Sequence, residues 1–245
     1  MSSYLLQSVD TPVAGVQIWT AHLEALSSAE LGELNALLDA GERARAARFH
    51  FEHDRRHFVG SHGLLRRLLS AALDKPAAAL VFEHGAHGKP AISSSAFAQK
   101  RTLRFNLSHS AGWAMFALAW DCEVGIDLES SIRLKRDADG LAGLAARVLS
   151  ARELTIWQAL PETARDAAFL RAWTRKEAYA KATGRGLLEE LIRTDVALDA
   201  AAPKSSLTLR SPQEGDVTRD WVLHDLPAPD GFAAALAVEQ TRQRQ

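Results

Sequence analysis

The sequence contains a single cysteine, Cys122, among its 245 residues. One cysteine excludes an internal disulfide framework and fits a reducing compartment, so we expect a cytoplasmic protein in which Cys122 is a small packed residue. Long apolar runs are missing too, since the longest, such as 113–120, are far too short to span a bilayer. The N-terminus has no basic stretch followed by an apolar run, so the sequence predicts no signal peptide.

The chain also lacks a surplus of charge of either sign. It has 29 Lys and Arg against 30 Asp and Glu, a formal net charge of −1 at pH 7. This balance gives no reason to expect nucleic acid or an anionic membrane as a partner. The 47% of hydrophobic and 24% of charged residues are typical of a globular protein with a substantial core.

Strand and helix patterns alternate along the chain, which predicts a mixed fold. The predicted strands are 16–23, 80–83, 103–107, 112–120, 123–128, 207–209, 221–226 and 232–238. Among them, 112–120 and 123–128 are expected to form a hairpin that turns at Asp121 and Cys122.

Two capping boxes, Ser27 with Glu30 and Ser150 with Glu153, predict helix starts. The first helix is expected to end at Gly41. A helix is then expected through the Arg-rich segment that begins at residue 42 and on to residue 73, and another over 163–182.

A faint internal repeat divides the sequence. The tripeptide at 112–114, Gly-Trp-Ala, precedes an apolar strand as Gly-Phe-Ala does at 231–233, and the two capping boxes are offset by a similar distance. This repeat suggests a pseudodimer of two similar α+β halves, which we place at 1–120 and 121–245.

The predicted helix over 163–182 carries an unusual stripe. Phe169, Trp173, Glu177 and Lys181 follow one another at four-residue steps, each about 6 Å apart along one face. One interpretation is an ordinary surface pair of Glu177 with Lys181.

Two further acids, Asp127 and Glu129, stand two residues apart in a predicted strand and so share one face, about 7 Å apart. Solvation alone could explain such an outward pair. If they converged with Glu177, however, the three carboxylates would bind a hard cation such as Mg²⁺. Lys181, Lys89 and the Arg-rich segment would then suit phosphates, a set typical of chemistry at phosphorus.

Four motifs carry a family resemblance. They are Gly-Lys-Pro at 88–90, Phe-Asn-Leu-Ser-His-Ser at 105–110, Gly-Ile-Asp-Leu-Glu at 125–129 and Trp-Thr-Arg-Lys-Glu-Ala-Tyr-Ala-Lys at 173–181. In this order and spacing they resemble the 4′-phosphopantetheinyl transferases of the Sfp (surfactin-synthetase-activating) type. The close match spans residues 85–187.

The resemblance implies a pseudodimer that binds coenzyme A in the cleft between its halves. It implies Mg²⁺ ligands, a lysine on the pyrophosphate, contacts to the phosphates of the coenzyme, and a basic residue near its 3′-phosphate. By this resemblance the Mg²⁺ ligands are Asp127, Glu129 and Glu177, and the lysine on the pyrophosphate is Lys181. The implied contacts to the phosphates of the coenzyme are Ser108, His109 and Lys89, and the basic residue near its 3′-phosphate is Arg45.

The implied activity is that of a holo-[acyl-carrier-protein] synthase. This enzyme moves phosphopantetheine from coenzyme A to a serine of an apo acyl or peptidyl carrier protein and releases adenosine 3′,5′-bisphosphate. Glu177 is expected to act as the base, directly or through water, and Lys181 to neutralise charge on the leaving phosphate. We expect a monomer that serves fatty-acid, polyketide or peptide synthesis. The alternatives are a catalytically silent protein that binds coenzyme A or carriers, and a Mg²⁺-dependent nucleotide pyrophosphatase.

Overall fold

The computed structural model describes residues 5–11, 13–85, 87–93, 101–132, 140–184, 195–198, 204–211 and 217–240. Its strands are β1 (Gln7–Val9), β2 (Val16–His22), β3 (Phe82–His84), β4 (Pro90–Ile92), β5 (Leu103–Ser110), β6 (Trp113–Trp120), β7 (Val124–Ser130), β8 (Lys204–Ser211), β9 (Val217–Leu226) and β10 (Phe232–Gln240). Its α-helices are α1 (Ser28–Leu37), α2 (Ala40–Ala46), α3 (Glu52–Leu73), α4 (Gly140–Val148), α5 (Ala151–Ala159) and α6 (Glu162–Thr183). Two short 3₁₀ helices lie at Leu23–Ala25 and Ala77–Ala79.

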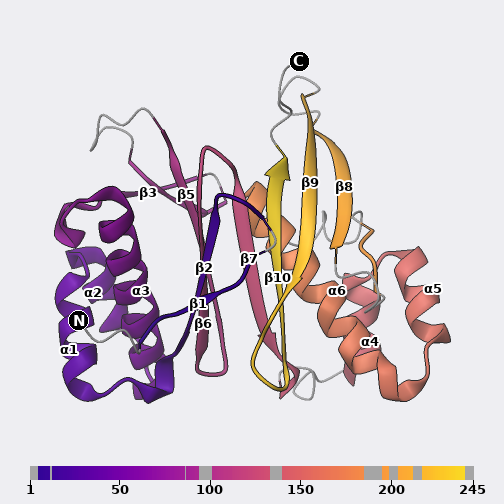
Figure 1. The fold of residues 1–245 in the computed structure, drawn as a ribbon. Coiled ribbons are helices and arrows are strands. Elements are labelled where there is room, and N and C mark those ends of the chain that lie inside the picture. Colours follow the sequence, from indigo (N-terminus) through magenta and orange to yellow (C-terminus); the bar gives the residue numbers. More distant parts are fainter. Residues whose placement is uncertain are drawn as a thin grey trace.

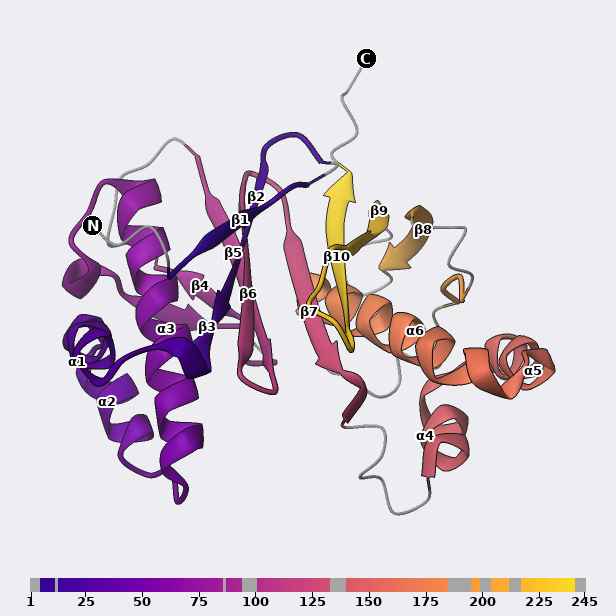
Figure 2. The same ribbon diagram turned by 60° about the horizontal axis from the view of Figure 1, so that its bottom comes forward.

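Two antiparallel sheets form the middle of the molecule, with the orders β1-β2-β6-β5 and β7-β10-β9-β8. Helices α1–α3 cover the outer face of the first sheet, and α4–α6 cover the outer face of the second (Figures 1 and 2). A small sheet of β3 and β4 lies beside the first. The fold is therefore a four-layer arrangement of helices, sheet, sheet and helices.

Apolar side chains fill the space between the sheets, because alternate residues of each central strand point inward. This core consists mainly of Val16, Ile18, Met115, Ala117, Ala119, Val124, Ile126, Leu128, Leu226, Ala234, Leu236 and Val238. A further apolar core lies beneath the helices of the first half, and another lies beneath those of the second. The face of β7 opposite Asp127 and Glu129, with Val124, Ile126 and Leu128, thus lies in the core between the sheets.

The two halves repeat one another, as the internal echo predicted. In each half a strand (β2 or β7) leads through helices to a 22-residue helix (α3 or α6), and the half ends with an antiparallel strand pair (β5–β6 or β9–β10). The last strand is central in both sheets and follows a glycine with positive φ, Gly112 at 81° and Gly231 at 80°. The expected pseudodimer of similar α+β halves is confirmed.

The predicted helix end at Gly41 is wrong. Helix α1 ends at Leu37, and Asp39 caps a new helix by a capping box with Glu42, so Gly41 lies in the first turn of α2. The chain breaks again before Phe51, whose extended backbone precedes α3. This second break lets Phe49 pack against Phe58, with 5.4 Å between the ring centroids. The helix expected from residue 42 to residue 73 is therefore two helices.

The predicted hairpin of 112–120 with 123–128 is also wrong. Both segments are strands, but β6 pairs with β2 and β5, whereas β7 pairs with β10. The chain crosses between the sheets at Asp121, whose φ is 58° and whose carboxylate accepts from Arg101 and from the backbone N–H of Thr102. Burial of the apolar faces between the sheets outweighs the local turn.

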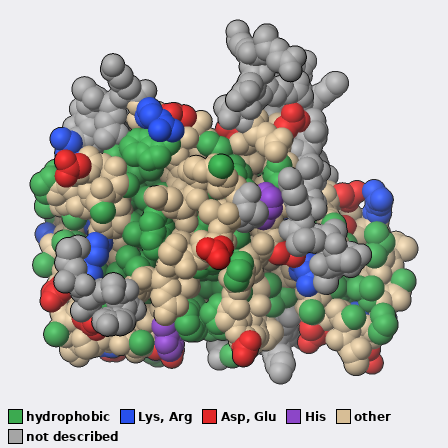
Figure 3. Space-filling model, viewed as in Figure 1, with side chains coloured by type: hydrophobic (Ala, Val, Ile, Leu, Met, Phe, Trp, Pro, Cys, Tyr) green, Lys and Arg blue, Asp and Glu red, His purple; other side chains and the backbone are tan. Residues whose placement is uncertain are grey.

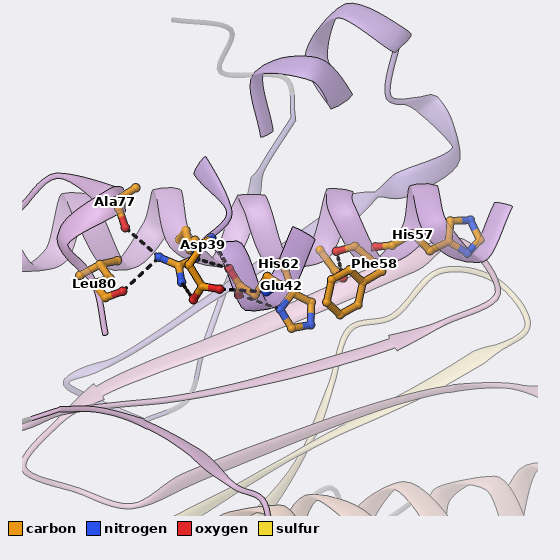
Figure 4. Close-up of polar contacts among 9 residues, drawn as sticks. Asp39, Glu42, His57, Phe58, His62, Ala77 and Leu80 are labelled. Carbon is orange, nitrogen blue, oxygen red and sulfur yellow. Dashed lines mark hydrogen bonds and ion pairs between the residues drawn. The ribbon is translucent and has the colours of Figure 1, made fainter. Parts of the chain in front are cut away.

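A buried arginine, Arg66, organises the helices of the first half. Its guanidinium contacts Glu42 and Asp39, both at 2.5 Å, and donates to the carbonyls of Ala77 and Leu80 (Figure 4). Burial alone would raise the pKa of Glu42, but hydrogen bonds from His62, from the Asp39 backbone and from Arg66 together lower it. This network ties α2 to α3 and to the turn that follows α3.

The lone cysteine is packed as predicted. Cys122 Sγ lies 3.0 Å from the carbonyl oxygen of Glu239 at the junction of the two sheets, and burial raises the pKa of its thiol to about 11. No helix in the described part of the chain has the length and apolarity needed to cross a membrane. On the face seen in Figure 3, acidic and basic side chains are scattered among hydrophobic ones, in keeping with the balanced charge.

Candidate active site

Strand β7 carries the two acids of the site on the face turned toward α6. The same face includes Gly125, where an added Cβ would lie 2.1 Å from the carbonyl oxygen of Ala178 and 2.4 Å from the backbone nitrogen of Ala182. Glycine therefore allows the helix to lie directly on the strand. Asp127 and Glu129 are only 4% and 6% exposed. The alternative of a solvated acidic pair is thus wrong.

Lysine, acid and serine from three distant segments meet beneath this helix. Lys181 Nζ on α6 lies 2.6 Å from Asp127 Oδ1 and 2.9 Å from Ser108 Oγ, which in turn donates to Asp127 Oδ1 at 2.9 Å. Lys181 therefore forms its ion pair with Asp127, and not the surface pair with Glu177 that its spacing suggested. The structure thus brings together residues from β5, β7 and α6.

The Asp127 carboxylate has one oxygen to spare. Its Oδ2 is buried and has no hydrogen-bond partner among the residues that the structure describes, an arrangement that costs about 1–3 kcal/mol unless a cation or water compensates it. A hard cation such as Mg²⁺ prefers carboxylate oxygens. The spare oxygen thus fits a metal ligand.

The two glutamates are buried as well. Glu129 and Glu177 are each 6% exposed and have interaction partners. Within the described ranges, no three acidic, histidine or cysteine side chains are placed together as a metal site requires. Binding of one ion by Asp127, Glu129 and Glu177 would therefore require side-chain movement, and this ligand set stays a prediction.

Lys89 contacts the start of β7 and the end of α6, and its ammonium already has hydrogen-bond partners there. Its ammonium contacts the Glu123 carboxylate at 2.7 Å and the carbonyls of Ala182 and Val124 at 2.7 and 3.3 Å. Burial lowers the pKa of Lys89, and the Glu123 carboxylate offsets part of this effect. Three partners use its three N–H donors, so Lys89 ties the first half to the end of α6. A phosphate contact by Lys89 remains a prediction.

The other two predicted contact residues lie at the surface. His109 is exposed near the end of β5, beside Ser108. Arg45 is exposed on α2, with its guanidinium 5.1 Å from the ring centroid of Phe58. Helix α2 belongs to the outer layer of the first half, whereas the Lys181–Asp127 pair lies beside the second sheet (Figure 2). The structure therefore does not bring Arg45 into contact with that pair.

Asn106 and Ser110 belong to the motif at 105–110, but the sequence assigned neither of them a role. Their side chains accept hydrogen bonds from the backbone of β7, at Ile126 and Ser130. The pattern that could have revealed them is the alternation Asn-x-Ser-x-Ser at 106–110, which puts three short polar side chains on one face of a strand.

Comparison with known families divides the chain at the crossover between the sheets. Residues 25–121 match the family described as 4′-phosphopantetheinyl transferase, N-terminal. Residues 123–237 match the 4′-phosphopantetheinyl transferase superfamily.

Several curated proteins are similar over most of their length. The 4′-phosphopantetheinyl transferase HetI of a Nostoc species is 36% identical over 225 residues, covering 91% of this chain and 87% of the relative. The 4′-phosphopantetheinyl transferase psf-1 of Bacillus pumilus is 29% identical over 198 residues, covering 81% and 74%. A holo-(acyl-carrier-protein) synthase from Bacillus anthracis, solved with coenzyme A (3′,5′-ADP), covers 49% of this chain and 96% of its own, with 20% identity and a TM-score of 0.34.

Proposed function

The chain belongs to the 4′-phosphopantetheinyl transferase superfamily, and we propose that it transfers 4′-phosphopantetheine from coenzyme A to a serine of an apo acyl or peptidyl carrier protein. The observation that carries the proposal is the contact of Ser108, Asp127 and Lys181. It unites three of the family's motifs at one point, with a free carboxylate oxygen beside a cation.

The protein's own residues would act on the charges of the reaction. Lys181, placed by α6, would hold the pyrophosphate and stabilise the charge that develops on the departing adenosine 3′,5′-bisphosphate. The carrier hydroxyl oxygen would form the new bond to phosphorus while the pyrophosphate P–O bond breaks. The hydroxyl proton would pass to Glu177, directly or through water.

Magnesium is the cation we propose for this site. Asp127, through its spare Oδ2, with Glu129 and Glu177 would hold it. When bound, Mg²⁺ supplies Lewis-acid polarisation of the phosphoryl oxygens. We further propose Ser108, His109, Lys89 and Arg45 as contacts of the coenzyme, 1–120 and 121–245 as the two halves, and action as a cytoplasmic monomer.

The decisive experiment weighs the intact carrier. The protein is incubated with coenzyme A, Mg²⁺ and each of several apo carriers from fatty-acid, polyketide and peptide synthesis. A mass gain of one phosphopantetheine supports transfer. Free 4′-phosphopantetheine without a carrier adduct would identify a pyrophosphatase, and coenzyme binding with neither product would identify a silent binding protein.

The Glu177→Gln variant tests the role of Glu177 in the transfer. It keeps the shape of the side chain but cannot take up the proton, so transfer should be abolished while part of the coenzyme binding remains. Isothermal titration with coenzyme A measures the binding. Full transfer by this variant would remove Glu177 from the mechanism.

A further inference from the structure

Strands β5 and β7 lie side by side without sharing a sheet. Three side chains of β5 bridge them: Asn106 Oδ1 accepts from the backbone N–H of Ile126 at 2.9 Å, Ser108 Oγ from Leu128 at 3.1 Å, and Ser110 Oγ from Ser130 at 3.2 Å. Each pair is separated by 20 residues, so the two strands run in the same direction. All six residues are buried. We call this set of bonds the side-chain ladder.

The ladder supplies hydrogen-bond acceptors to the edge of β7 that no strand in the described part of the chain covers. Backbone N–H groups alternate between the two sides of a strand, and β10 pairs with the other side of β7. Buried N–H groups without acceptors would cost about 1–3 kcal/mol each. Side chains of β5 therefore take the place of a backbone partner, and they fix the position of β7 along its own axis.

The middle rung connects this ladder to the site. Ser108 Oγ accepts from Leu128 and from Lys181 and donates to Asp127, which uses all the hydrogen-bonding capacity of a hydroxyl. The outer rungs, Asn106 and Ser110, accept from backbone N–H groups of β7, at Ile126 and Ser130. Asp127 and Glu129 lie along β7 between the residues whose backbone N–H groups donate to the ladder.

We propose that Asn106 and Ser110 are positioning residues, which act through the backbone of β7 to hold Asp127 and Glu129 in place against α6. The proposal rests on the proposed function only in taking this site as the transferase site. It assigns the outer polar residues of the Asn-x-Ser-x-Ser pattern a task distinct from contact with the coenzyme.

The test uses Asn106→Ala and Ser110→Ala, each of which deletes one acceptor. Ser110→Thr restores a hydroxyl and should rescue the second variant. Thr20→Val is the matched control, because Thr20 also joins a strand side chain to a backbone group, the carbonyl of Ala114, away from β7. Hydrogen exchange of the peptide covering 124–130 reports on the backbone, and titration with Mn²⁺ reports on the acids without needing turnover.

We expect exchange in 124–130 to accelerate about tenfold in both alanine variants, the effect of losing one buried hydrogen bond. Mn²⁺ affinity and kcat should each fall by about 10- to 100-fold, as when groups that orient metal ligands are removed. The KM for the carrier should change little. Ser110→Thr should return all three quantities toward the wild-type values, and Thr20→Val should change none.

Faster exchange with unchanged Mn²⁺ affinity would overturn the proposal, because the ladder would then serve the fold alone. Unchanged exchange would overturn it as well. If Asn106→Ala does not fold, the Ser110 pair decides by the same readouts. Failure of the wild-type protein to modify any carrier would refute the proposed function, while the exchange and Mn²⁺ results would still judge the ladder.

Discussion

The first strands of the two halves, β2 and β7, occupy equivalent places but carry different side chains. Their registers against the central strands correspond along their length. In the first half, Val16 pairs with Ala119, Trp19 with Phe116 and Ala21 with Ala114. At the equivalent positions of the second half, Val124 pairs with Val238, Asp127 with Ala235 and Glu129 with Ala233. Trp19 and Ala21 in the first half thus stand where the acids stand in the second.

This difference shows that the architecture does not require the acids. In β2 the same face packs into the apolar core beneath the helices, with Ala21 3% exposed and Trp19 partly buried. Burying carboxylates at the equivalent positions costs free energy that the apolar residues do not cost. We infer that Asp127 and Glu129 are present for their chemistry.

The edges of β2 and β7 that lie opposite the central strands explain why the side-chain ladder forms at β7 and not at β2. Strand β1 covers the outer edge of β2 with backbone pairs at Ile18 and Thr20. These residues correspond to Ile126 and Leu128, which receive side chains of β5 instead. An added strand closes the edge of β2, whereas side chains of β5 close the corresponding edge of β7.

The largest effect should come from Asp127→Asn, which removes the charge that the other half lacks at this position. We expect kcat/KM for carrier modification to fall by roughly a thousandfold, since a charge that stabilises the transition state contributes several kcal/mol. Steady-state kinetics by mass measurement provides the value. Trp19→Phe, at the equivalent site, should leave it within about threefold. A loss under tenfold for the asparagine variant would contradict the comparison.

Next in size is Gly125→Ala, compared with Gln17→Ala at the equivalent position. The new methyl group would overlap the backbone of α6, so the free energy of unfolding should drop by about 3 kcal/mol or more. Gln17 is exposed, and its replacement should change stability by less than about 0.5 kcal/mol. Urea titration measures both. Equal effects would show that the two halves pack their helices alike.

A smaller effect, confined to the first half, should follow from Glu42→Gln. Because the pKa of Glu42 lies below its ordinary value of 4.5 in the folded protein, its contribution to stability is complete above that pH and is lost as the pH falls through the lowered value. The variant should be less stable by about 2 kcal/mol at pH 7, with a difference that shrinks in acid. Urea titrations from pH 7 to pH 3 test this. A constant difference across that range would contradict it.

The smallest effect should come from Lys89→Met, which cuts a tie between the halves. Three hydrogen bonds are lost, but the desolvation cost of the ammonium is lost with them, so we expect destabilisation of about 1 kcal/mol. Arg104→Gln removes a more exposed partner of Glu123 and serves as the control. If Lys89 instead contacts a phosphate, coenzyme affinity would fall steeply while stability would not.

Much of this fold follows from local patterns in the sequence. The capping boxes at Ser27 and Ser150 begin helices as predicted, and the alternation in 124–128 divides β7 into an apolar and an acidic face. These features depend on neighbours in the chain. A third capping box, Asp39 with Glu42, has the same spacing in the sequence, but Gly41 between the two residues favoured the end of a helix instead.

Other features depend on partners far away in the chain. Adjacency of β6 and β7 in sequence favoured a hairpin, but their apolar faces are buried across two sheets instead. The spacing of Glu177 and Lys181 favoured a local pair, yet Lys181 meets an acid 54 residues away. The sequence around Lys89 does not indicate its contacts with backbone carbonyls of α6 and β7.

The packed thiol of Cys122 has a practical consequence. Because burial raises the pKa of the Cys122 thiol to about 11, this thiol is protonated at pH 7 to a greater extent than that of an ordinary exposed cysteine. A maleimide dye would therefore react faster with a cysteine introduced on the surface than with the native residue. One label on each half would turn the separation of the two sheets into a fluorescence signal.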